Sequence, residues 1–373
     1  VFTGPHAVAV RNDSETLAPL SLWSTGNSWH EMPSGWFQEP PEEVALWDYR
    51  DILYTTELRV GPGPSKVLHV MIDTGSSNLW LKSELVPNTA EVMGDVDAHV
   101  TYVMGVVYGK EAQDRMCLAA LCVGKQPFVL ALKIEGMGRN SELFDGILGM
   151  AFPQMLDVGT RTFFEDLGSG FNNLGFGLVL RGLQSGPSFL TLGEVPELIR
   201  DAEKKASTKS VTLDVHGFET RKQAELGEHG PFLFWFVAME LCVRVGGDDS
   251  STLLKLNGYG IVDSGTSLLL LPMPAYKQAM WALTFGQKVR AFHHGLVDCE
   301  SQLNPLVFHF PGREGDLILT LSTSDLLLPT PSTWHGRKVC KIGISPLEDD
   351  GEGQTLPHMI LGDVFMRKVT SIF

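Results

Sequence analysis

Short segments of alternating apolar and polar residues dominate the chain from Tyr54 onward. The first two run over Tyr54–Val60 and Val67–Asp73, and the turn-forming stretch Gly61–Ser65 separates them. Alternation with a period of two is typical of strands that bury one face, and Gly and Pro between such runs favour tight turns. Similar runs punctuated by Gly continue through most of the sequence. The pattern therefore predicts an all-β fold with a few short helices.

Four other segments add to this picture. The best helical pattern covers Pro274–Phe285, with Pro at its entry. The apolar run Pro231–Met239 is far shorter than the roughly 20 residues that cross a bilayer, so we interpret it as a buried strand. The polar stretch Gly217–Gly230 is typical of a surface insertion. Residues 1 to 45 have poor periodicity and are expected to be extended or loop-like.

Two stretches far apart in the chain are variants of one pattern. His69–Leu81 has the sequence HVMIDTGSSNLWL, and Tyr259–Leu271 has the sequence YGIVDSGTSLLLL. Each runs from apolar residues into Asp, a small hydroxyl residue, Gly, a second hydroxyl residue and Ser. Because each copy carries one carboxylate, at Asp73 and at Asp263, the repeat predicts two related lobes that meet at a pair of acids.

A second pair of similar segments supports the repeat. Phe144–Met150 follows the first Asp motif and Met359–Phe365 follows the second, and both contain Ile-Leu-Gly. A single Ile-Leu-Gly is commonly just a buried strand that enters a turn, but the same order twice favours a duplicated lobe. We place the lobe boundary near Arg200. The expected parts are an N-terminal extension, an N-terminal lobe and a C-terminal lobe, over residues 1–45, 46–200 and 201–373.

Composition and charge narrow the function classes. The 373 residues are 43% hydrophobic and 20% charged, which excludes a disordered or fibrous class. The formal net charge of −15 repels phosphate backbones, so we expect no nucleic-acid partner. The same acidity suits an acidic compartment. The five cysteines form no CxxC pair and no zinc-finger spacing, so we expect no structural metal site and one or two disulfides.

The repeated motif carries the residue types that acid–base hydrolysis needs. Gly75 and Gly265 lack a Cβ, so two loops can approach closely and a backbone N–H can point at each carboxylate. The hydroxyl groups beside them can hold the acids or brace the loops; they belong to Thr74, Ser76, Ser264 and Thr266. Two carboxylates within hydrogen-bonding distance cannot both stay ionised, so the pair shares a proton.

Such a pair can hydrolyse an amide without a metal or an organic cofactor. A water between the acids loses a proton to one carboxylate while the other acid polarises the carbonyl. One Asp-Thr-Gly alone is usually only a turn with an Asp cap. Two matched copies in apolar surroundings favour the catalytic interpretation.

These motifs resemble those of the pepsin-like aspartic proteases, and the similarity extends over about Leu46–Phe373. The resemblance implies two β-barrel-like lobes with a cleft between them, and Asp73 and Asp263 as the catalytic pair. It also implies hydrogen bonds from Ser76 and Thr266 to the outer carboxylate oxygens. In that family, residues that match Thr74 and Ser264 hold the two motifs together across the lobes.

The resemblance further implies a flap, a hairpin that closes over the substrate. Val100–Gly109 resembles it, with Tyr102 at the position of the flap tyrosine and Gly105 at the expected spacing. Trp80 matches the tryptophan that supports the flap, and the Tyr102 hydroxyl could hydrogen-bond toward it. The structural alternative is that Tyr102 is only a cross-strand aromatic residue.

The chain departs from the family at the flap tip, where Val103 and Met104 replace the usual Gly and Thr. This bulkier apolar tip predicts a narrower cleft that favours hydrophobic substrate side chains. Of the typical disulfides, the resemblance implies only Cys299–Cys340. Cys117 and Cys122 lie in an insertion after the flap and can pair only if a hairpin separates them, so we do not expect that disulfide.

Both ends of the chain also depart from the family. The family's prosegment is basic, whereas residues 1–45 contain Arg11 as their only Lys or Arg. They are interpreted as a prosegment remnant or a lineage-specific extension. The chain opens with Val1 and stops at Ile372–Phe373, where the family continues through one more strand, so a longer or processed protein is expected.

We therefore predict an aspartic endopeptidase that cleaves extended, largely apolar segments of protein or peptide substrates at acidic pH. Inhibition by a pepstatin-type compound and a monomeric state are expected. The sequon Asn12–Ser14 favours a secretory, endolysosomal or vacuolar compartment, or secretion, and a membrane anchor beyond Phe373 stays open. The alternative is a catalytically inactive homologue that acts as a binding or inhibitory protein, and the two intact Asp motifs argue against it.

Overall fold

The structure is a computed structural model. It describes residues 6–13, 16–23, 42–102, 105–159, 161–168, 174–182, 185–206, 210–217, 232–245, 251–291, 296–313, 315–347 and 358–373. The expected surface insertion at Gly217–Gly230 lies outside these residues except for Gly217 itself.

Strands make up most of the described chain. The strands of the N-terminal half are β1 (His6–Asp13), β2 (Thr16–Trp23), β3 (Glu42–Asp48), β4 (Tyr54–Val60), β5 (Lys66–Asp73), β6 (Leu79–Lys82), β7 (Glu91–Tyr102), β8 (Gly105–Leu118), β9 (Leu121–Glu135), β10 (Gly146–Gly149), β11 (Leu174–Val179) and β12 (Ser188–Glu194). Those of the C-terminal half are β13 (Val211–Asp214), β14 (Phe236–Arg244), β15 (Thr252–Val262), β16 (Leu269–Pro272), β17 (Leu296–Asp298), β18 (Leu306–Phe310), β19 (Leu317–Leu321), β20 (Leu327–Trp334), β21 (Arg337–Ile342), β22 (Ile344–Leu347), β23 (His358–Leu361) and β24 (Val369–Ile372).

The helices are short and few. They are α1 (Phe163–Leu167), α2 (Val195–Ala206), α4 (Met273–Thr284), α5 (Thr323–Leu326) and α6 (Asp363–Met366), with 3-10 turns at η1 (Gly138–Leu143) and η2 (Pro153–Met155). The prediction of an all-β fold with few helices is confirmed.

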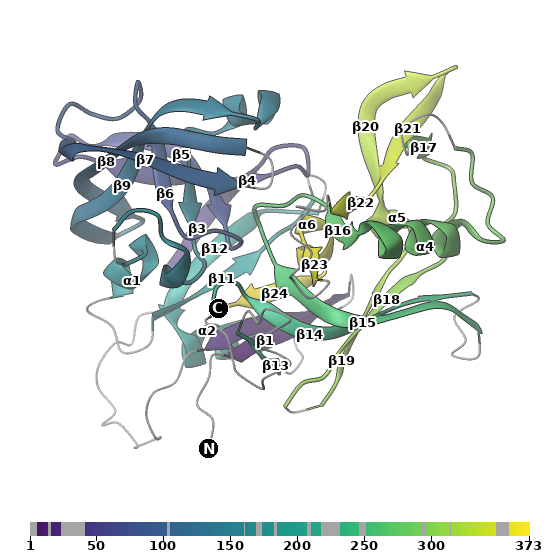
Figure 1. Cartoon of the computed structure of the whole chain (residues 1–373). Helices are drawn as coiled ribbons and strands as arrows, with labels where there is room; N and C mark the ends of the chain where they lie inside the picture. Colours follow the sequence, from purple (N-terminus) through teal and green to yellow (C-terminus); the bar gives the residue numbers. More distant parts are fainter. Residues whose placement is uncertain are drawn as a thin grey trace, which may run out of the picture.

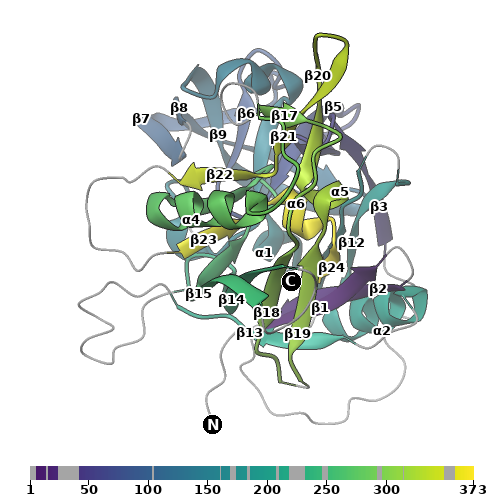
Figure 2. The same cartoon turned by 90° about the vertical axis from the view of Figure 1, so that its right-hand side faces the viewer.

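Two lobes stand side by side above a shared layer of strands (Figure 1). The N-terminal lobe holds β3 to β10, and the C-terminal lobe holds a seven-stranded sheet in the order β19-β18-β14-β15-β23-β16-β22. A separate three-stranded sheet, β17-β21-β20, projects from the C-terminal lobe (Figure 2). The shared layer continues the N-terminal sheet through β12, β11 and β24, so hydrogen bonding between strands links both halves of the chain.

The two sequence repeats form equivalent substructures. In the N-terminal lobe, β10 lies parallel to β5, which ends at Asp73, and antiparallel to β6. In the C-terminal lobe, β23 lies parallel to β15, which ends just before Asp263, and antiparallel to β16. Each Ile-Leu-Gly strand therefore lies between the strand that leads into an Asp motif and the strand that follows it.

The glycine of each Ile-Leu-Gly is required by close packing. A Cβ on Gly149 would lie 2.5 Å from the carbonyl carbon of Ser77, and one on Gly362 would lie 2.1 Å from the carbonyl oxygen of Thr266. Both contacts are with backbone of the loop behind an Asp motif, which cannot move aside cheaply. The repeated Ile-Leu-Gly in the sequence is thus explained by close packing against the two Asp loops.

Most predicted elements are found close to their expected bounds. Tyr54–Val60 is β4, and the expected strand Val67–Asp73 forms all but the first residue of β5. The expected helix Pro274–Phe285 is α4, displaced by one residue. The apolar run Pro231–Met239 enters a strand only at Phe236. The proposed lobe boundary near Arg200 falls inside α2, and that division stays a prediction.

The N-terminal extension contributes strands. β1 pairs with β24 in antiparallel register, Val8 opposite Ile372, and with β13 on its other side. β2 runs parallel to β24 beside it. The expectation of an extended conformation is therefore correct for these two segments, which join the shared layer.

Two disulfides form. Cys299 pairs with Cys340, as the family resemblance implies. Cys117 also pairs with Cys122, so our expectation against this disulfide was wrong. The reason is that β8 and β9 form one tight hairpin in which these two cysteines are directly opposite each other, with Cα atoms 4.0 Å apart. Cys242 is a buried free thiol.

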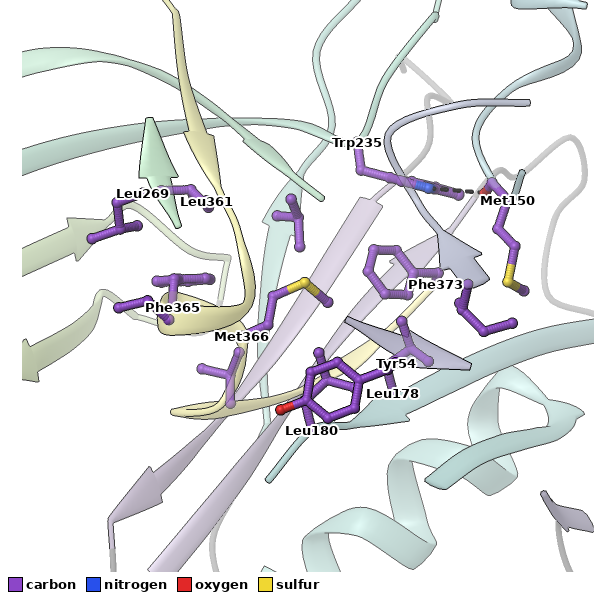
Figure 3. Packing of buried hydrophobic residues seen from close by; sticks show 14 of the residues in the cluster. Tyr54, Met150, Leu178, Leu180, Trp235, Leu269, Leu361, Phe365, Met366 and Phe373 are labelled. Carbon is purple, nitrogen blue, oxygen red and sulfur yellow. Dashed lines mark hydrogen bonds between the residues drawn. The ribbon is translucent and has the colours of Figure 1, made fainter. Parts of the chain in front are cut away.

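One hydrophobic core runs beneath both lobes (Figure 3). The Phe373 ring stacks on Phe176 from the shared layer, with centroids 4.7 Å apart, and lies 5.1 Å from the Trp235 ring of the C-terminal lobe. Trp235 also donates a hydrogen bond from its indole nitrogen to the carbonyl oxygen of Met150 in the N-terminal lobe, at 3.1 Å. These contacts fix how the lobes sit relative to each other.

A group of charged side chains also lies where the lobes join. Asp363 is fully buried, and neither of its carboxylate oxygens has a hydrogen-bond partner. Arg367 lies one turn further on and approaches Asp51 of the N-terminal lobe at 3.7 Å. Burial raises the pKa of Asp363 well above its ordinary value, although the positive charge of Arg367 opposes this. Burial likewise raises the pKa of Asp48 to about 6.

The raised pKa values of Asp363 and Asp48 predict that the free energy of unfolding falls as the pH rises above the pKa of an ordinary carboxyl group. A raised folded-state pKa means that the folded protein keeps its proton to a higher pH than the unfolded chain does. For Asp48, the contribution of the protonated carboxyl group to the free energy of unfolding is therefore complete below about pH 4 and is lost as the pH rises to about 6. Asp48→Asn removes the titrating proton. We expect the decrease in unfolding free energy between acidic and neutral pH to shrink by about 1 kcal/mol, since solvent reaches part of this side chain.

Urea unfolding at a series of pH values measures this change. Asp97→Asn, at an exposed site on β7, is the matched control and should leave the pH dependence as in the parent. An equal pH dependence in the parent and in Asp48→Asn would contradict the prediction.

Candidate active site

The two predicted acids meet at the floor of the space between the lobes. Apolar strand residues precede each acid, and backbone hydrogen bonds then hold its loop: Met150 N–H donates to the Asp73 carbonyl and Asp263 N–H donates to the Leu361 carbonyl. Asp73 is 5% exposed and Asp263 is 8% exposed. Both side chains are thus almost completely withdrawn from bulk water, although both line a cleft.

Each acid has the same hydrogen-bond partners from its own motif. Asp73 accepts from the backbone N–H of Gly75 at 2.8 Å and from the Ser76 hydroxyl at 2.5 Å. Asp263 accepts from the backbone N–H of Gly265 at 2.8 Å and from the Thr266 hydroxyl at 2.6 Å. In both cases one carboxylate oxygen faces the glycine and the other faces the hydroxyl, so the two sites share a local two-fold arrangement.

The glycines bring the two acids together. A Cβ on Gly75 would lie 2.5 Å from the carboxyl carbon of Asp263, and one on Gly265 would lie 2.4 Å from an oxygen of Asp73. Each glycine therefore contacts the carboxylate of the opposite motif. Any larger residue at either position would push the two carboxyl groups apart.

Hydrogen bonds across the lobes hold the motifs in this arrangement. Thr74 donates from its hydroxyl to the Val262 carbonyl at 2.9 Å and accepts from the backbone N–H of Ser264 at 3.0 Å. Reciprocally, Ser264 donates from its hydroxyl to the Ile72 carbonyl at 2.8 Å and accepts from the backbone N–H of Thr74 at 3.2 Å. All four bonds are buried, so loss of either hydroxyl would strand polar backbone groups.

The electrostatics agree with a shared proton. Burial raises the pKa of Asp73, and the charge of Asp263 raises it further. The hydrogen bonds from Ser76 and Gly75 act in the opposite sense, because they stabilise the ionised form. The net direction is upward. The first proton lost by the pair therefore leaves one carboxylate and one carboxylic acid side by side.

The expected flap is an antiparallel hairpin of β7 and β8, in which Tyr102 is directly opposite Gly105. A Cβ on Gly105 would lie 2.1 Å from the carbonyl oxygen of Glu135, so β9 packs too closely for any other residue. The Trp80 indole donates a hydrogen bond to the Tyr102 hydroxyl at 2.9 Å. Burial and the nearby charge of Asp73 raise the pKa of Tyr102, which keeps this hydroxyl protonated.

Val103 and Met104, the expected flap tip, lie outside the described residues. The Trp80 side chain is completely buried, and its ring is 6.0 Å from that of Phe144. The support for Tyr102 is therefore rigid.

A large cleft of about 1890 Å³ opens above the acids. Both lobes line it, and many of its lining side chains are apolar. They include Leu53, Met71, Val100, Phe144, Ile147, Met155, Phe234, Ile261, Leu268, Leu270, Leu327, Leu328, Leu347 and Ile360. The paired acids are among its lining residues.

Some residues of the site were not singled out from the sequence. Ser267 donates a hydrogen bond from its hydroxyl to the Ile52 carbonyl across the lobes. Asn78 bonds Asp157 at the rim of the cleft, with 3.0 Å between the side chains. Asp363, which immediately follows the second Ile-Leu-Gly, is close enough to Asp263 for their charges to interact. Its position after a glycine in an apolar run was the only available signal.

Within the described ranges, no group of His, Cys, Asp and Glu side chains is arranged to hold a metal ion. None of the helices in this part of the chain is long and apolar enough to cross a membrane.

Comparison with known proteins adds independent evidence. The family model for eukaryotic aspartyl proteases matches residues 53–373. Gastricsin of Cavia porcellus is 28% identical over 345 residues, which cover 87% of this chain and 78% of gastricsin. Cathepsin D of Chionodraco hamatus is 26% identical over 352 residues, which cover 89% of this chain and 81% of the relative.

A solved structure shows the same fold. The crystal structure of aspartic proteinase from Irpex lacteus superposes with a TM-score of 0.62 at 20% identity, covering 89% of this chain and 96% of that one. Because the family model spans most of the chain and includes both Asp motifs, the chain belongs to the eukaryotic aspartyl protease family, whose members are aspartic-type endopeptidases.

Proposed function

We propose that Asp73 and Asp263 hydrolyse peptide bonds by general acid–base catalysis with a water held between them. The observation that carries this proposal is the reciprocal contact of each motif glycine with the opposite carboxylate. This contact supports a close approach of the two acids. The hydroxyl and backbone donors behind them hold both carboxyl groups in one orientation.

The reaction follows from one shared proton. The ionised carboxylate takes a proton from the water as its oxygen attacks the carbonyl carbon, and the protonated acid donates its proton to the carbonyl oxygen. The tetrahedral intermediate then breaks its C–N bond: the amide nitrogen leaves with the proton of the dyad, and a hydroxyl of the intermediate returns a proton to the other carboxylate as the carboxylic acid product forms. The acids exchange roles during the cycle and end with one proton between them, so no external reductant, metal or cofactor enters the balance.

The cleft supports extended substrates with apolar side chains beside the scissile bond. Met71, Ile147 and Ile261 lie on strands next to the acids and line the cleft. Burial of a substrate side chain against such residues contributes about 25 cal/mol for each Å² of apolar surface. An extended conformation is favoured because the flap strand β7 and the opposite strand β20 both border the cleft.

Partners and location follow from family membership. Family members act on peptides, so protein or peptide substrates and inhibition by a pepstatin-type compound are part of the proposal, together with a monomeric state. Gastricsin and cathepsin D are relatives, which supports a secreted or endolysosomal location. An inactive scaffold is the alternative, but both acids and all four hydroxyl partners are in place.

Substitution of either acid tests the mechanism. Asp73→Asn and Asp263→Asn keep the shape of the side chain but remove the shared proton and the base, so each should reduce cleavage of a denatured protein at acidic pH by at least about a thousandfold. The parent should be blocked by a pepstatin-type inhibitor. Asp97→Asn is the control and should keep full activity; an acid variant that stays active and folded would refute the mechanism.

The flap hydrogen bond gives a second test. Tyr102→Phe removes the acceptor of the buried Trp80 indole N–H and should lower kcat/KM about tenfold, because the flap loses its support while the acids are untouched. Tyr108→Phe, on the same hairpin but exposed, is the matched control. Equal kcat/KM in Tyr102→Phe and the parent would show that Tyr102 is merely a cross-strand aromatic.

A peptide library tests the substrate preference. We expect cleavage to concentrate where apolar residues flank the scissile bond, because these side chains would fill the apolar part of the cleft. Mass spectrometry of the products identifies the cleavage sites. Cleavage without any enrichment of apolar residues would contradict this part of the proposal.

A further inference from the structure

The C-terminal lobe carries a surface that extends beyond the substrate cleft, although part of β20 and Lys341 also line the cleft. We call it the aromatic–basic face, and it consists of residues 273–291 on and after α4 together with the sheet formed by β17, β21 and β20. Both parts lie on the same side of the molecule, away from the N-terminal lobe, and both are seen in front in Figure 2.

The helix α4 shows the first unusual feature of this face. Ala279, Ala282 and Leu283 are buried in the core, whereas two large aromatic residues point outward. Trp281 is 54% exposed and Phe285, just beyond the helix end, is 48% exposed. Their rings lie 4.9 Å apart and form one aromatic patch. An outward-facing pair of this size is costly in water unless something covers it.

The hairpin of β20 and β21 carries a third exposed aromatic residue. Trp334 is at its tip and is 52% exposed. Every residue from Pro331 to Lys338 is exposed, so the tip projects well beyond the lobe (Figure 1).

Charge is the second unusual feature. The described segments of the face contain six Lys or Arg residues and one acidic residue, Asp298, a formal charge of +5; Glu300, two residues after β17, lowers this to +4, in a chain whose net charge is −15. The six cations are Lys277, Lys288, Arg290, Arg337, Lys338 and Lys341. All six are exposed. The rest of the molecule is therefore strongly acidic, and this face is where an anionic partner meets the least repulsion.

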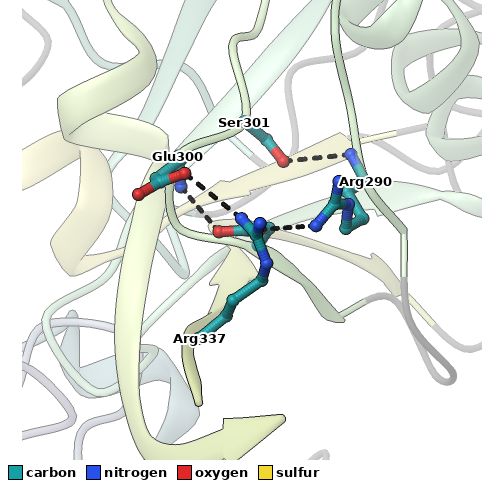
Figure 4. A network of polar contacts seen from close by, with 5 residues as sticks. Arg290, Glu300, Ser301 and Arg337 are labelled. Atoms are coloured by element: carbon teal, nitrogen blue, oxygen red, sulfur yellow. Dashed lines mark hydrogen bonds and ion pairs between the residues drawn. The ribbon is translucent and has the colours of Figure 1, made fainter. Parts of the chain in front are cut away.

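A polar network holds the two halves of the face together (Figure 4). Asp298 is buried, and one of its carboxylate oxygens forms ion pairs with the guanidinium groups of Arg337, at 2.9 Å, and of Arg290, at 3.8 Å. Arg337 also contacts Glu300 at 3.3 Å. The disulfide Cys299–Cys340 joins β21 to the residue after β17. The aromatic tip and the aromatic patch are thus kept in a fixed relation.

We propose that the aromatic–basic face docks the enzyme on the surface of an anionic lipid bilayer. Tryptophan and phenylalanine side chains insert favourably at the level of the lipid head groups, while lysine and arginine attract the anionic phosphates. The face offers both kinds of residue on two rigid projections. An acidic polypeptide would match the cations but would leave the three exposed aromatic side chains unexplained, so the lipid surface is the better match.

Docking would also place the cleft beside the bilayer. The strand β20 lines the cleft at Leu328–Pro331 and reaches Trp334 only three residues later, about 10 Å further along a strand. Substrates on or near a membrane surface would then lie within reach of the acids. The proposal concerns binding alone and is independent of the peptidase mechanism.

Vesicle binding tests the proposal. The full chain should sediment with vesicles made of equal parts phosphatidylcholine and phosphatidylserine, less so at high salt, and not with phosphatidylcholine vesicles. The double variant Lys277→Glu and Lys338→Glu should bind at least about tenfold more weakly, because each cation near the surface adds to the attraction. The double variant Trp281→Ala and Trp334→Ala should weaken binding to a similar degree.

Matched controls lie on the N-terminal lobe. Lys66→Glu with Lys125→Glu changes the net charge equally, and Leu132→Ala removes an apolar side chain that is 60% exposed. Both controls should bind vesicles as the parent does, and cleavage of a soluble peptide should be unchanged in every variant, which verifies folding.

Three results would overturn the proposal. They are equal loss of binding in the controls, equal binding to phosphatidylcholine alone, and binding to polyglutamate but not to phosphatidylserine vesicles. The last would instead assign an acidic polypeptide to this face.

Discussion

Two carboxyl groups held close together are the constraint on which the rest of this structure depends. Water separates like charges readily, so an exposed pair would drift to a larger distance. Here Gly75 and Gly265 each contact the opposite acid, and Thr74 and Ser264 tie the two loops together with buried hydrogen bonds. The duplicated lobes, the parallel strands behind each loop and the shared core beneath them all serve to hold this one contact.

The sequence was most informative where physical constraints leave few residue choices. The Asp motifs and the two Ile-Leu-Gly strands could be predicted because close backbone contacts exclude every residue except glycine at Gly149 and Gly362. The helix α4 and strands β4 and β5 could be predicted from periodicity, since each buries one face. The all-β, two-lobed fold followed from the repeat and the family resemblance together.

Features that depend on long-range geometry were less accessible. The Cys117–Cys122 disulfide requires the exact register of the β8–β9 hairpin, which the four intervening positions do not reveal. The charged group around Asp363 is formed by segments more than 300 residues apart, so no local sequence pattern predicts it. The aromatic–basic face was also missed, because Trp281 fits a helical pattern equally well whether it points inward or outward.

Charge is distributed unevenly in the molecule. Asp363 and Asp48 at the lobe junction hold protons longer than ordinary carboxyl groups, which agrees with the proposed activity at acidic pH. The cations of the aromatic–basic face lie on and after α4 and on the β20–β21 hairpin, and one of them, Lys341, also lines the cleft.

The central claim is that Asp73 and Asp263 hold one proton between them. Carbon-13 labelling of the aspartate carboxyl groups, followed by an NMR titration, measures this directly, with Asp73→Asn and Asp263→Asn used to assign the two signals. The account predicts a coupled titration in which the pair keeps one proton far above the ordinary aspartate pKa. Two independent titrations near the ordinary value would show that the acids do not share a proton, and would contradict the account.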